Sequence, residues 1–289
     1  MTARTGSVAL PSTYFSTRLL SAQPIRNVLR EIGQWLVFMA QTFWYLPLTI
    51  RRYRRQTFRE MNNLAWGRGR IIVDGGVISV FVILGVAIGG SLAVEAFSTL
   101  NIVGFGALSG LTGGVGAVRI IGPIATGVAF ASQAGCRMTA EIGTMRIAEE
   151  IDAVEAMGLI PIPFVVCTRL IGAMLCVIPG YLLTLVTEFW VMDIVIRVFH
   201  NQPGGTYTHY LAEFTTPQDL AYSMIKGIIF CAAVTVIHCY YGYFVSGGPV
   251  GLGRASGRAV RASLVAIMVL DFILTVMLWG LRPIFVFKG

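Results

Sequence analysis

The chain has 289 residues, of which 55% are hydrophobic and 12% are charged, with a formal net charge of +8 and a mean hydropathy of +0.73. Soluble globular domains carry about 25% charged residues, so this composition indicates an integral membrane protein without a separate soluble domain of useful size. The two lysines, Lys226 and Lys288, lie outside any G-x-x-x-x-G-K-[ST] loop. We therefore expect a protein that is not an enzyme, hydrolyses no ATP by that route and needs no cofactor of its own.

Three other kinds of site or segment are disfavoured by the sequence. The five cysteines form no C-x-x-C pair, and the three histidines lack cysteine or carboxylate neighbours at metal-ligand spacing. We therefore expect buried thiols and no metal site. Nucleic-acid binding accounts for the positive charge less well than a basic membrane flank does. No cleavable signal peptide is expected, because the first residues have no uninterrupted apolar core before a small-residue cleavage site.

Residues 1–70 are expected to form a cytoplasmic and interfacial region. An aromatic-rich stretch at about residues 28–50 is apolar, but Gln34 and Pro47 are among the residues that interrupt it, and the sequence RRYRR follows at once. Aromatic side chains suit the headgroup level, which favours an amphipathic helix lying in the plane of the membrane. A sixth membrane crossing is the alternative.

Residues 71–289 are expected to form one membrane domain with five spans. A spanning helix needs about 20 mostly apolar residues, and irregular backbone exposed to lipid would leave polar groups unpaired. The predicted spans are Ile71–Phe97, Val103–Ala134, Ile162–Ile196, Leu220–Val245 and Val260–Leu281.

The first two spans are rich in glycine, including the i, i+4 pairs Gly85 and Gly89, and Gly106 and Gly110. Small residues at this spacing let helices approach closely. Two interpretations stay open: tight packing within one bundle, or a subunit interface or deformable wall around a cavity.

Between the second and third spans lies an acidic block, QAGCRMTAEIGTMRIAEEIDAVEAMG, from Gln133 to Gly158. A charge at the centre of the hydrocarbon costs roughly 2.5–3.5 kcal/mol, so the block is expected outside the bilayer. On a helical wheel, apolar and acidic residues fall on opposite sides. The apolar side holds Ala140, Ile147, Ile151 and Val154, and the acidic side holds Glu141, Glu149, Asp152 and Glu155. This pattern predicts a surface amphipathic helix that docks a partner.

The placement of arginine predicts the orientation. Eleven of the 22 basic residues precede Ile71, and the expected loop Ser246–Arg261 carries three arginines, whereas the turn Ser98–Val103 and the loop Val198–Asp219 carry no Lys or Arg. The positive-inside rule then places the N-terminus, the acidic block and the Ser246–Arg261 loop in the cytoplasm. After five spans the C-terminus lies outside.

Three stretches resemble one family of membrane proteins. They are AGCRMTAEIGTMRIAEEIDAVEAMG within the acidic block, Arg119–Pro123 upstream, and Gly242–Gly280 downstream. This combination is similar to the MlaE/YrbE permeases, the membrane subunits of ABC transporters that work with MCE-domain lipid-binding proteins. The arginine-rich, lysine-poor composition looks closest to the actinobacterial YrbE branch of the Mce systems.

The resemblance implies an all-α architecture, with an N-terminal interfacial helix, five transmembrane helices and a cytoplasmic coupling helix between the second and third. It also implies two permease chains, identical or not, and an ABC ATPase dimer on the cytoplasmic face that holds ATP and Mg. The block would then be the helix that engages the ATPase. Its candidate coupling residues are Glu141, Arg146, Glu149, Glu150, Asp152 and Glu155. The alternative is that these charges only solvate a surface helix.

A lipid pathway between the two permeases is also implied by the resemblance. The corresponding positions are Leu92, Thr99, Leu100, Val103 and Arg119. Ordinary helix packing is the alternative. In the family the arginine is next to a glutamate, but here Ile120 follows it, so Asp74, Glu95, Glu188 or a partner chain would have to supply the countercharge. Asp271 is expected to pair with Arg169 or Lys226.

The function implied is a permease subunit in the bacterial inner membrane that moves fatty acids, sterols or phospholipids together with MCE-domain proteins on the outer side, in the direction of import. Two alternatives stay open. An ion-driven secondary transporter should show repeated halves, and no convincing repeat is visible. A non-transporting membrane scaffold could use the same acidic helix.

Overall fold

The computed structural model describes residues 23–67 and 76–280. These residues are helical and include no β-strand, as the sequence predicts. The chain divides into two compact units, Met1–Phe38 and Met39–Gly289. The described part of the first unit is the beginning of helix α1 (Gln23–Arg52), and all other helices belong to the second unit.

Two helices precede the first span. α1 contains the predicted helix at about residues 28–50, and Tyr53 separates it from α2 (Arg54–Trp66). α2 packs closely against α7 (Thr168–Val198), because a Cβ added at Gly172 would lie 3.0 Å from the backbone nitrogen of Met61. The position of α1 in the plane of the membrane stays a prediction.

Five helical stretches within the described ranges are long and apolar enough to cross a membrane, and α1 is not among them. The predicted number of spans is therefore confirmed. The spans are α3 (Val77–Ile102), Thr112–Ile147, Ile162–Val198, α9 (Pro217–Tyr243) and α10 (Gly248–Trp279). The second consists of η2 (Thr112–Ile121), α4 (Gly122–Phe130), η3 (Ala131–Gly135) and α5 (Cys136–Ile147), and the third of η4 (Ile162–Cys167) and α7.

The ends of the spans differ from the predictions. The second span continues past Ala134 to Ile147, and the fifth begins at Gly248 instead of Val260. The arginines expected in the loop before the fifth span, at positions 254, 258 and 261, therefore lie in α10. The turn predicted at Ser98–Val103 is helical as far as Ile102. Apolar composition marks only the part of a helix that lies in hydrocarbon, whereas its hydrogen bonding continues into polar sequence.

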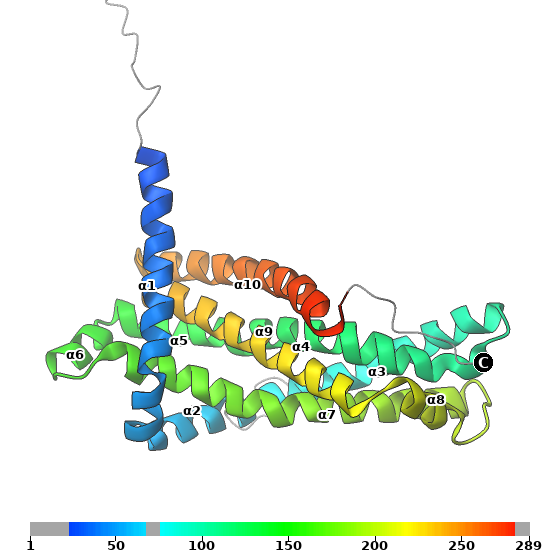
Figure 1. Ribbon diagram of the computed structural model, residues 1–289. Coiled ribbons are helices and arrows are strands. Elements are labelled where there is room, and N and C mark those ends of the chain that lie inside the picture. The colour runs from blue at the N-terminus through cyan, green and yellow to red at the C-terminus, as the bar shows by residue number, and fades with distance from the viewer. Residues whose placement is uncertain (1–22, 68–75, 281–289) are drawn as a thin grey trace, which may run out of the picture. The chain divides into compact units, whose positions relative to one another are not determined.

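The second unit has two distinct ends. α6 (Glu150–Ala156) lies at one end and α8 (Thr206–Phe214) at the other, and α7 runs between them (Figure 1). Near α8, a short 3-10 turn, η1 (Gly106–Ser109), precedes the second span. A Cβ at Gly110, which directly follows η1, would lie 2.6 Å from the backbone nitrogen of Leu211, so the chain just before the second span closely approaches α8.

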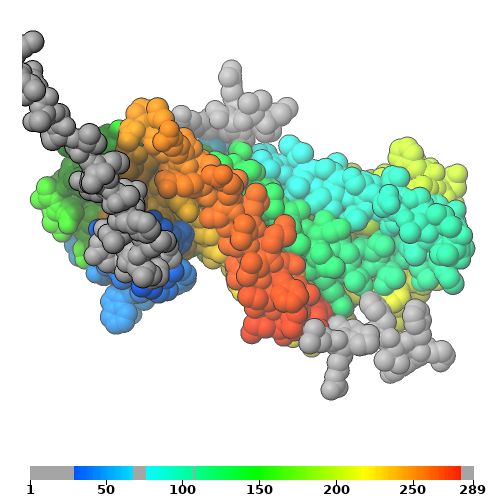
Figure 2. Space-filling model, turned by 90° about the horizontal axis from the view of Figure 1, so that it is seen from above, coloured from blue at the N-terminus to red at the C-terminus, as the bar shows by residue number. Residues whose placement is uncertain are grey.

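α10 lies across one face of the second unit, where it forms the orange and red band of Figure 2. Many of its apolar side chains are exposed: Val265, Met268, Val269, Phe272 and Met277. A helix that carries exposed apolar residues over several turns suits contact with lipid or with another membrane chain.

Glycines bring α3 and α7 together. A Cβ at Gly85 would lie 2.6 Å from the Thr184 carbonyl oxygen, and one at Gly89 would lie 2.5 Å from the Glu188 carbonyl oxygen. Both glycines therefore serve packing within the bundle, which was one of the two sequence interpretations. Beyond them, Ala93 of α3 packs with Met192, Ile196 and Tyr207 in a buried cluster.

A buried lysine joins the second, fourth and fifth spans. The fully buried Lys226 lies 2.6 Å from Asp271 and donates hydrogen bonds to the Arg119 carbonyl oxygen and to Thr275, each at 2.9 Å. The expected pairing of Asp271 with Lys226 is therefore confirmed, and the alternative with Arg169 is not. All five cysteines are free, and four are buried, as predicted.

Replacing Gly89 with alanine is expected to destabilise the purified protein by about 1–3 kcal/mol, because the new methyl group would overlap the α7 backbone. Gly90→Ala is the matched control, since the nearest atom to its added Cβ is 3.9 Å away. Alanine at a helix position with such space should be neutral or stabilising by up to about 1 kcal/mol. Thermal unfolding in detergent measures both variants, and equal melting temperatures would contradict the packing argument.

Candidate functional site

The acidic block is divided between two helices. α5 ends at Ile147, Glu149 adopts the left-handed conformation at φ 57°, and α6 follows from Glu150 to Ala156. At its end the amide of Leu159 donates to Val154 O at 3.2 Å and the amide of Gly158 to Glu155 O at 2.9 Å, the pattern of a Schellman motif. The predicted surface helix is thus present between the second and third spans, but it is shorter than the block.

α6 presents carboxylates to its surroundings and packs its apolar residues inward. Ile151 is 0% and Val154 is 9% exposed. The exposed acidic residues are Glu149, Glu150, Asp152 and Glu155. Acidic residues in the first turn of α6 also interact favourably with the helix dipole.

The surface around α6 is both charged and apolar. Arg146 forms an ion pair with Asp152 at 2.6 Å, which connects the end of α5 to α6. Ile147, Met157 and Ile160 are exposed beside the acidic residues. Large apolar side chains next to fixed charges are typical of a surface that binds another protein.

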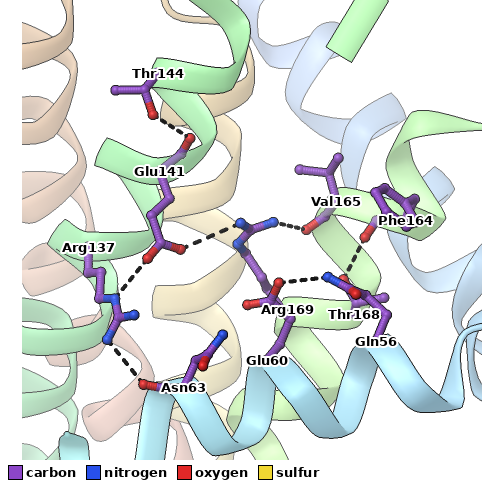
Figure 3. Close-up of polar contacts among 10 residues, drawn as sticks. All are labelled: Gln56, Glu60, Asn63, Arg137, Glu141, Thr144, Phe164, Val165, Thr168 and Arg169. Carbon is purple, nitrogen blue, oxygen red and sulfur yellow. Dashed lines mark hydrogen bonds and ion pairs between the residues drawn. The ribbon is translucent and has the colours of Figure 1, made fainter. Parts of the chain in front are cut away.

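Glu141 lies on α5, apart from the carboxylates of α6, and forms ion pairs with other residues of the chain. Its Oε1 accepts a hydrogen bond from Arg137 Nε at 2.8 Å, and its Oε2 accepts one from Arg169 NH2 at 3.5 Å (Figure 3). Arg137 also donates to Asn63 O at 3.1 Å, and the buried Arg169 donates to Val165 O at 2.9 Å. One carboxylate therefore joins α5 to α7 and, through Arg137, to α2.

The sequence prediction did not include α2 or Arg169 in this site. On α2, Gln56 donates to Glu60 at 3.0 Å, one turn before Asn63 (Figure 3). Arg169 could have been recognised from the sequence as part of a charged site, because an arginine within an apolar run needs a partner. The sequence suggested Asp271 as one candidate partner of Arg169, whereas the structure pairs Arg169 with Glu141.

Four of the five predicted lipid-pathway residues lie at the end of α3 and just after it. Leu92 packs against the buried cluster of Ala93, Met192, Ile196 and Tyr207. Thr99 and Val103 are exposed and Leu100 is half-buried. Phe97 stacks on His200 at a centroid distance of 4.0 Å, which joins the ends of α3 and α7.

Arg119 belongs to a different group of residues. It forms an ion pair with Asp219 at 3.1 Å, and Asp219 also accepts a hydrogen bond from Trp279 at 2.6 Å. The sequence did not suggest Asp219 as its partner. Of the suggested residues, Asp74 lies outside the described residues, and neither carboxylate oxygen of the buried Glu188 has a hydrogen-bond partner among the described residues.

In residues 23–67 and 76–280, no group of three or more His, Cys, Asp or Glu side chains could hold a metal ion. Instead, the buried His238 lies with its Nδ1 2.7 Å from Thr139 Oγ1.

Comparison with known proteins gives these surfaces a family context. The family model described as Permease MlaE matches residues 71–277. A Rickettsia prowazekii protein named "Probable ABC transporter permease protein" is 31% identical over 166 residues, which are 54% of this chain and 61% of that protein. The chain thus spans about three-fifths of this curated relative.

Two further relatives have more specific names. The "Intermembrane phospholipid transport system permease protein MlaE" of Haemophilus influenzae is 27% identical over 208 residues, 71% of this chain and 80% of that protein. The Arabidopsis thaliana "Protein TRIGALACTOSYLDIACYLGLYCEROL 1, chloroplastic" is 28% identical over 165 residues, 54% of this chain and 45% of that protein.

The matched region begins just before α3 and ends within α10, so it contains the first four spans, the acidic α6 and nearly all of the fifth span. It covers well over half of the chain, and the membrane character of the helices agrees with the description of the family. The chain is a multi-pass membrane protein that belongs to the MlaE permease family.

Proposed function

We propose that this chain is the permease subunit of an ABC transporter that moves lipids in the bacterial inner membrane together with MCE-domain proteins, in the direction of import. The observation that carries this proposal is α6, a short helix between two spans whose carboxylates are exposed and whose Ile151 is fully buried. Within a permease family, such a helix suits a partner that supplies the energy for transport. Fatty acids, sterols or phospholipids are the proposed substrates.

The proposed energy source is a pair of ABC ATPases that hold ATP and Mg and bind at α6. Glu149, Glu150, Asp152 and Glu155 would fix the orientation of the ATPase by charge, and Arg146 would hold Asp152 in place. Exposed Ile147 and Met157 would supply apolar contact area.

Glu141 has a different proposed role from the other five coupling residues. Its contacts with Arg137 and Arg169 lie within the chain, so it would transmit movement of α6 and α5 to α7 and α2. The 2.8 Å contact with Arg137 is a short charge-assisted hydrogen bond, and the longer 3.5 Å contact with Arg169 adds charge attraction, so together they would couple the displacement of these helices.

The distribution of arginine supports a cytoplasmic position for α6 and for the N-terminus. Arg254, Arg258 and Arg261 lie in the first half of α10, where Leu252 packs against Gly143 of α5. The arginines of α2 lie on a helix that contacts α5 through Asn63. At the other end, residues 198–218 contain no Lys or Arg. On the basis of the positive-inside rule, we propose that α6 and the N-terminus face the cytoplasm and that the C-terminus lies outside.

The proposed lipid pathway lies at the outer end of α3, along Leu92, Thr99, Leu100 and Val103. Exposed apolar residues around these positions, among them Ile102 and Phe105, would face lipid, a second permease chain or an MCE-domain protein. Arg119 is proposed to act on this pathway indirectly, because its ion pair with Asp219 holds the second span against the fourth.

Charge reversal on α6 tests the ATPase contact. We expect the Glu149→Lys/Glu155→Lys double variant to lower the amount of ABC ATPase that co-purifies from native membranes by about tenfold or more, because like charges placed across an interface cost several kcal/mol. Glu213→Lys, which reverses an exposed carboxylate on α8, is the control and should leave co-purification unchanged. Unchanged ATPase recovery with the double variant, at equal membrane insertion, would refute the role of α6.

A bulky residue at Val103 tests the pathway. Val103 and Val265 are both 64% exposed, so tryptophan fits at either position without disturbing the interior. We expect Val103→Trp to slow ATP-driven transfer of a fluorescent phospholipid by about tenfold, equivalent to about 1.4 kcal/mol in the barrier. The assay uses the whole complex in vesicles and also records ATPase recovery, which should stay constant. If Val265→Trp slowed transfer equally, the pathway would not lie at the end of α3.

A further inference from the structure

The junction between α1 and α2 forms a basic pocket that the proposed transport function does not use. The pocket has a volume of about 640 Å³. It is lined by Arg52, Tyr53, Arg55, Gln56 and Arg59. Pockets of roughly 300–1,000 Å³ are typical of sites for small ligands. The residues of this pocket would supply three guanidinium groups, one phenol and one amide.

The pocket carries positive charge that no described residue neutralises by an ion pair. Arg52, Arg55 and Arg59 are exposed, and none of them forms an ion pair with another described residue. The nearby Glu60 instead accepts a hydrogen bond from Gln56 at 3.0 Å. Like charges one helical turn apart repel each other, so an anion bound among these arginines would stabilise the junction.

The pocket is held in a fixed position on the second unit. The ring of Tyr53 packs edge-on against Phe164 of η4, with centroids 5.7 Å apart. Thr57 donates from both its amide and its hydroxyl to the Tyr53 carbonyl oxygen, at 2.9 and 3.0 Å. Because α2 also packs on Gly172 of α7, Arg55 and Arg59 are presented from a well-supported helix.

The surroundings of the pocket favour a lipid as the source of the anion. Ile50, which precedes the pocket arginines, and Phe58, which lies between Arg55 and Arg59, are 51% and 59% exposed. Arginines interleaved with exposed apolar side chains are typical of helices at the boundary between headgroups and acyl chains. Guanidinium groups bind phosphate oxygens through paired hydrogen bonds, and basic clusters beside spans attract anionic lipids.

We propose that the pocket lined by Arg52, Tyr53, Arg55, Gln56 and Arg59 binds the phosphate headgroup of an anionic phospholipid from the leaflet on the α6 side. This lipid is a bound ligand of the membrane surface and is distinct from the cargo proposed for the outer end of α3. Since α2 also carries Asn63, which contacts Arg137, an occupied pocket would stabilise the helix on which the Glu141 network rests.

The test measures binding of two phospholipids to the full-length chain purified in an uncharged detergent, by native mass spectrometry. The probes are phosphatidylglycerol and phosphatidylcholine with identical acyl chains. Each arginine near an anionic headgroup contributes about fivefold in affinity, so the Arg52→Gln/Arg55→Gln/Arg59→Gln variant should bind phosphatidylglycerol about 100-fold more weakly. Its weaker binding of phosphatidylcholine should not change.

The matched control is Arg254→Gln/Arg258→Gln/Arg261→Gln, which removes the same charge from exposed positions of α10. It should keep wild-type binding of phosphatidylglycerol. Equal loss in both triple variants would overturn the proposal, because the effect would then come from net charge alone. Displacement of phosphatidylglycerol by an equal concentration of inorganic phosphate would also overturn it, since the pocket would then take free phosphate.

Two further readouts distinguish lipid binding from protein binding and from misfolding of the variant. If the pocket variant bound phosphatidylglycerol normally but lost ATPase recovery from native membranes, the pocket would bind protein and the lipid proposal would be wrong. If the triple variant does not elute as a folded species, Arg55→Gln and Arg59→Gln are measured singly. Each should then lower phosphatidylglycerol binding about fivefold, and wild-type binding in both would contradict the proposal.

Discussion

The arrangement around α6 depends on the carboxylate of Glu141, which two arginines share. Arg137 comes from the same helix, one turn earlier, and the buried Arg169 comes from the third span. Arg169 in particular needs this countercharge, because its side chain is buried and an unpaired buried charge is strongly destabilising. The shared carboxylate therefore holds the end of the second span against the start of the third, and it connects both to α2 through Asn63. The short segment between these spans, which contains α6, is therefore anchored by this network.

The number of spans and the acidic face of α6 could be predicted from the sequence, because both follow from local composition. Long apolar stretches need helices in lipid, and carboxylates such as Glu150 and Glu155 must leave the hydrocarbon. The break at Glu149 could not be predicted, since the left-handed conformation of one residue leaves no trace in the apolar pattern. The ends of the spans were also missed, because α10 continues as a helix through Arg254 and Arg258, beyond the apolar stretch that marks the span.

The partners of the charged residues were less predictable than the helices. Lys226 and Asp271 could be paired from sequence because few countercharges were available within the spans. The partner of Arg119 was missed: Asp219 was assigned to an outer loop, whereas it lies in the first turn of α9, where it caps the helix with Thr216 and still reaches Arg119. Glu188 shows the opposite case. It was a candidate countercharge for Arg119, but neither of its carboxylate oxygens has a hydrogen-bond partner among the described residues. Contacts between helices that are distant in sequence depend on how each helix is rotated about its own axis, and composition does not encode this rotation.

The two ends of the second unit differ in chemistry, and α7 is the element that connects them. Arg169 lies near its beginning, in the charged network, and Met192 and Ile196 lie near its end, beneath Tyr207 and beside Leu92 of α3. Between these points Gly85 and Gly89 hold α3 directly against the α7 backbone. Because tightly packed helices have little free volume, a displacement of α7 at Arg169 would have to move α3 as well. In the proposed transporter, this would carry movement from the ATPase contact at α6 to the outer end of α3, where Val103 is exposed.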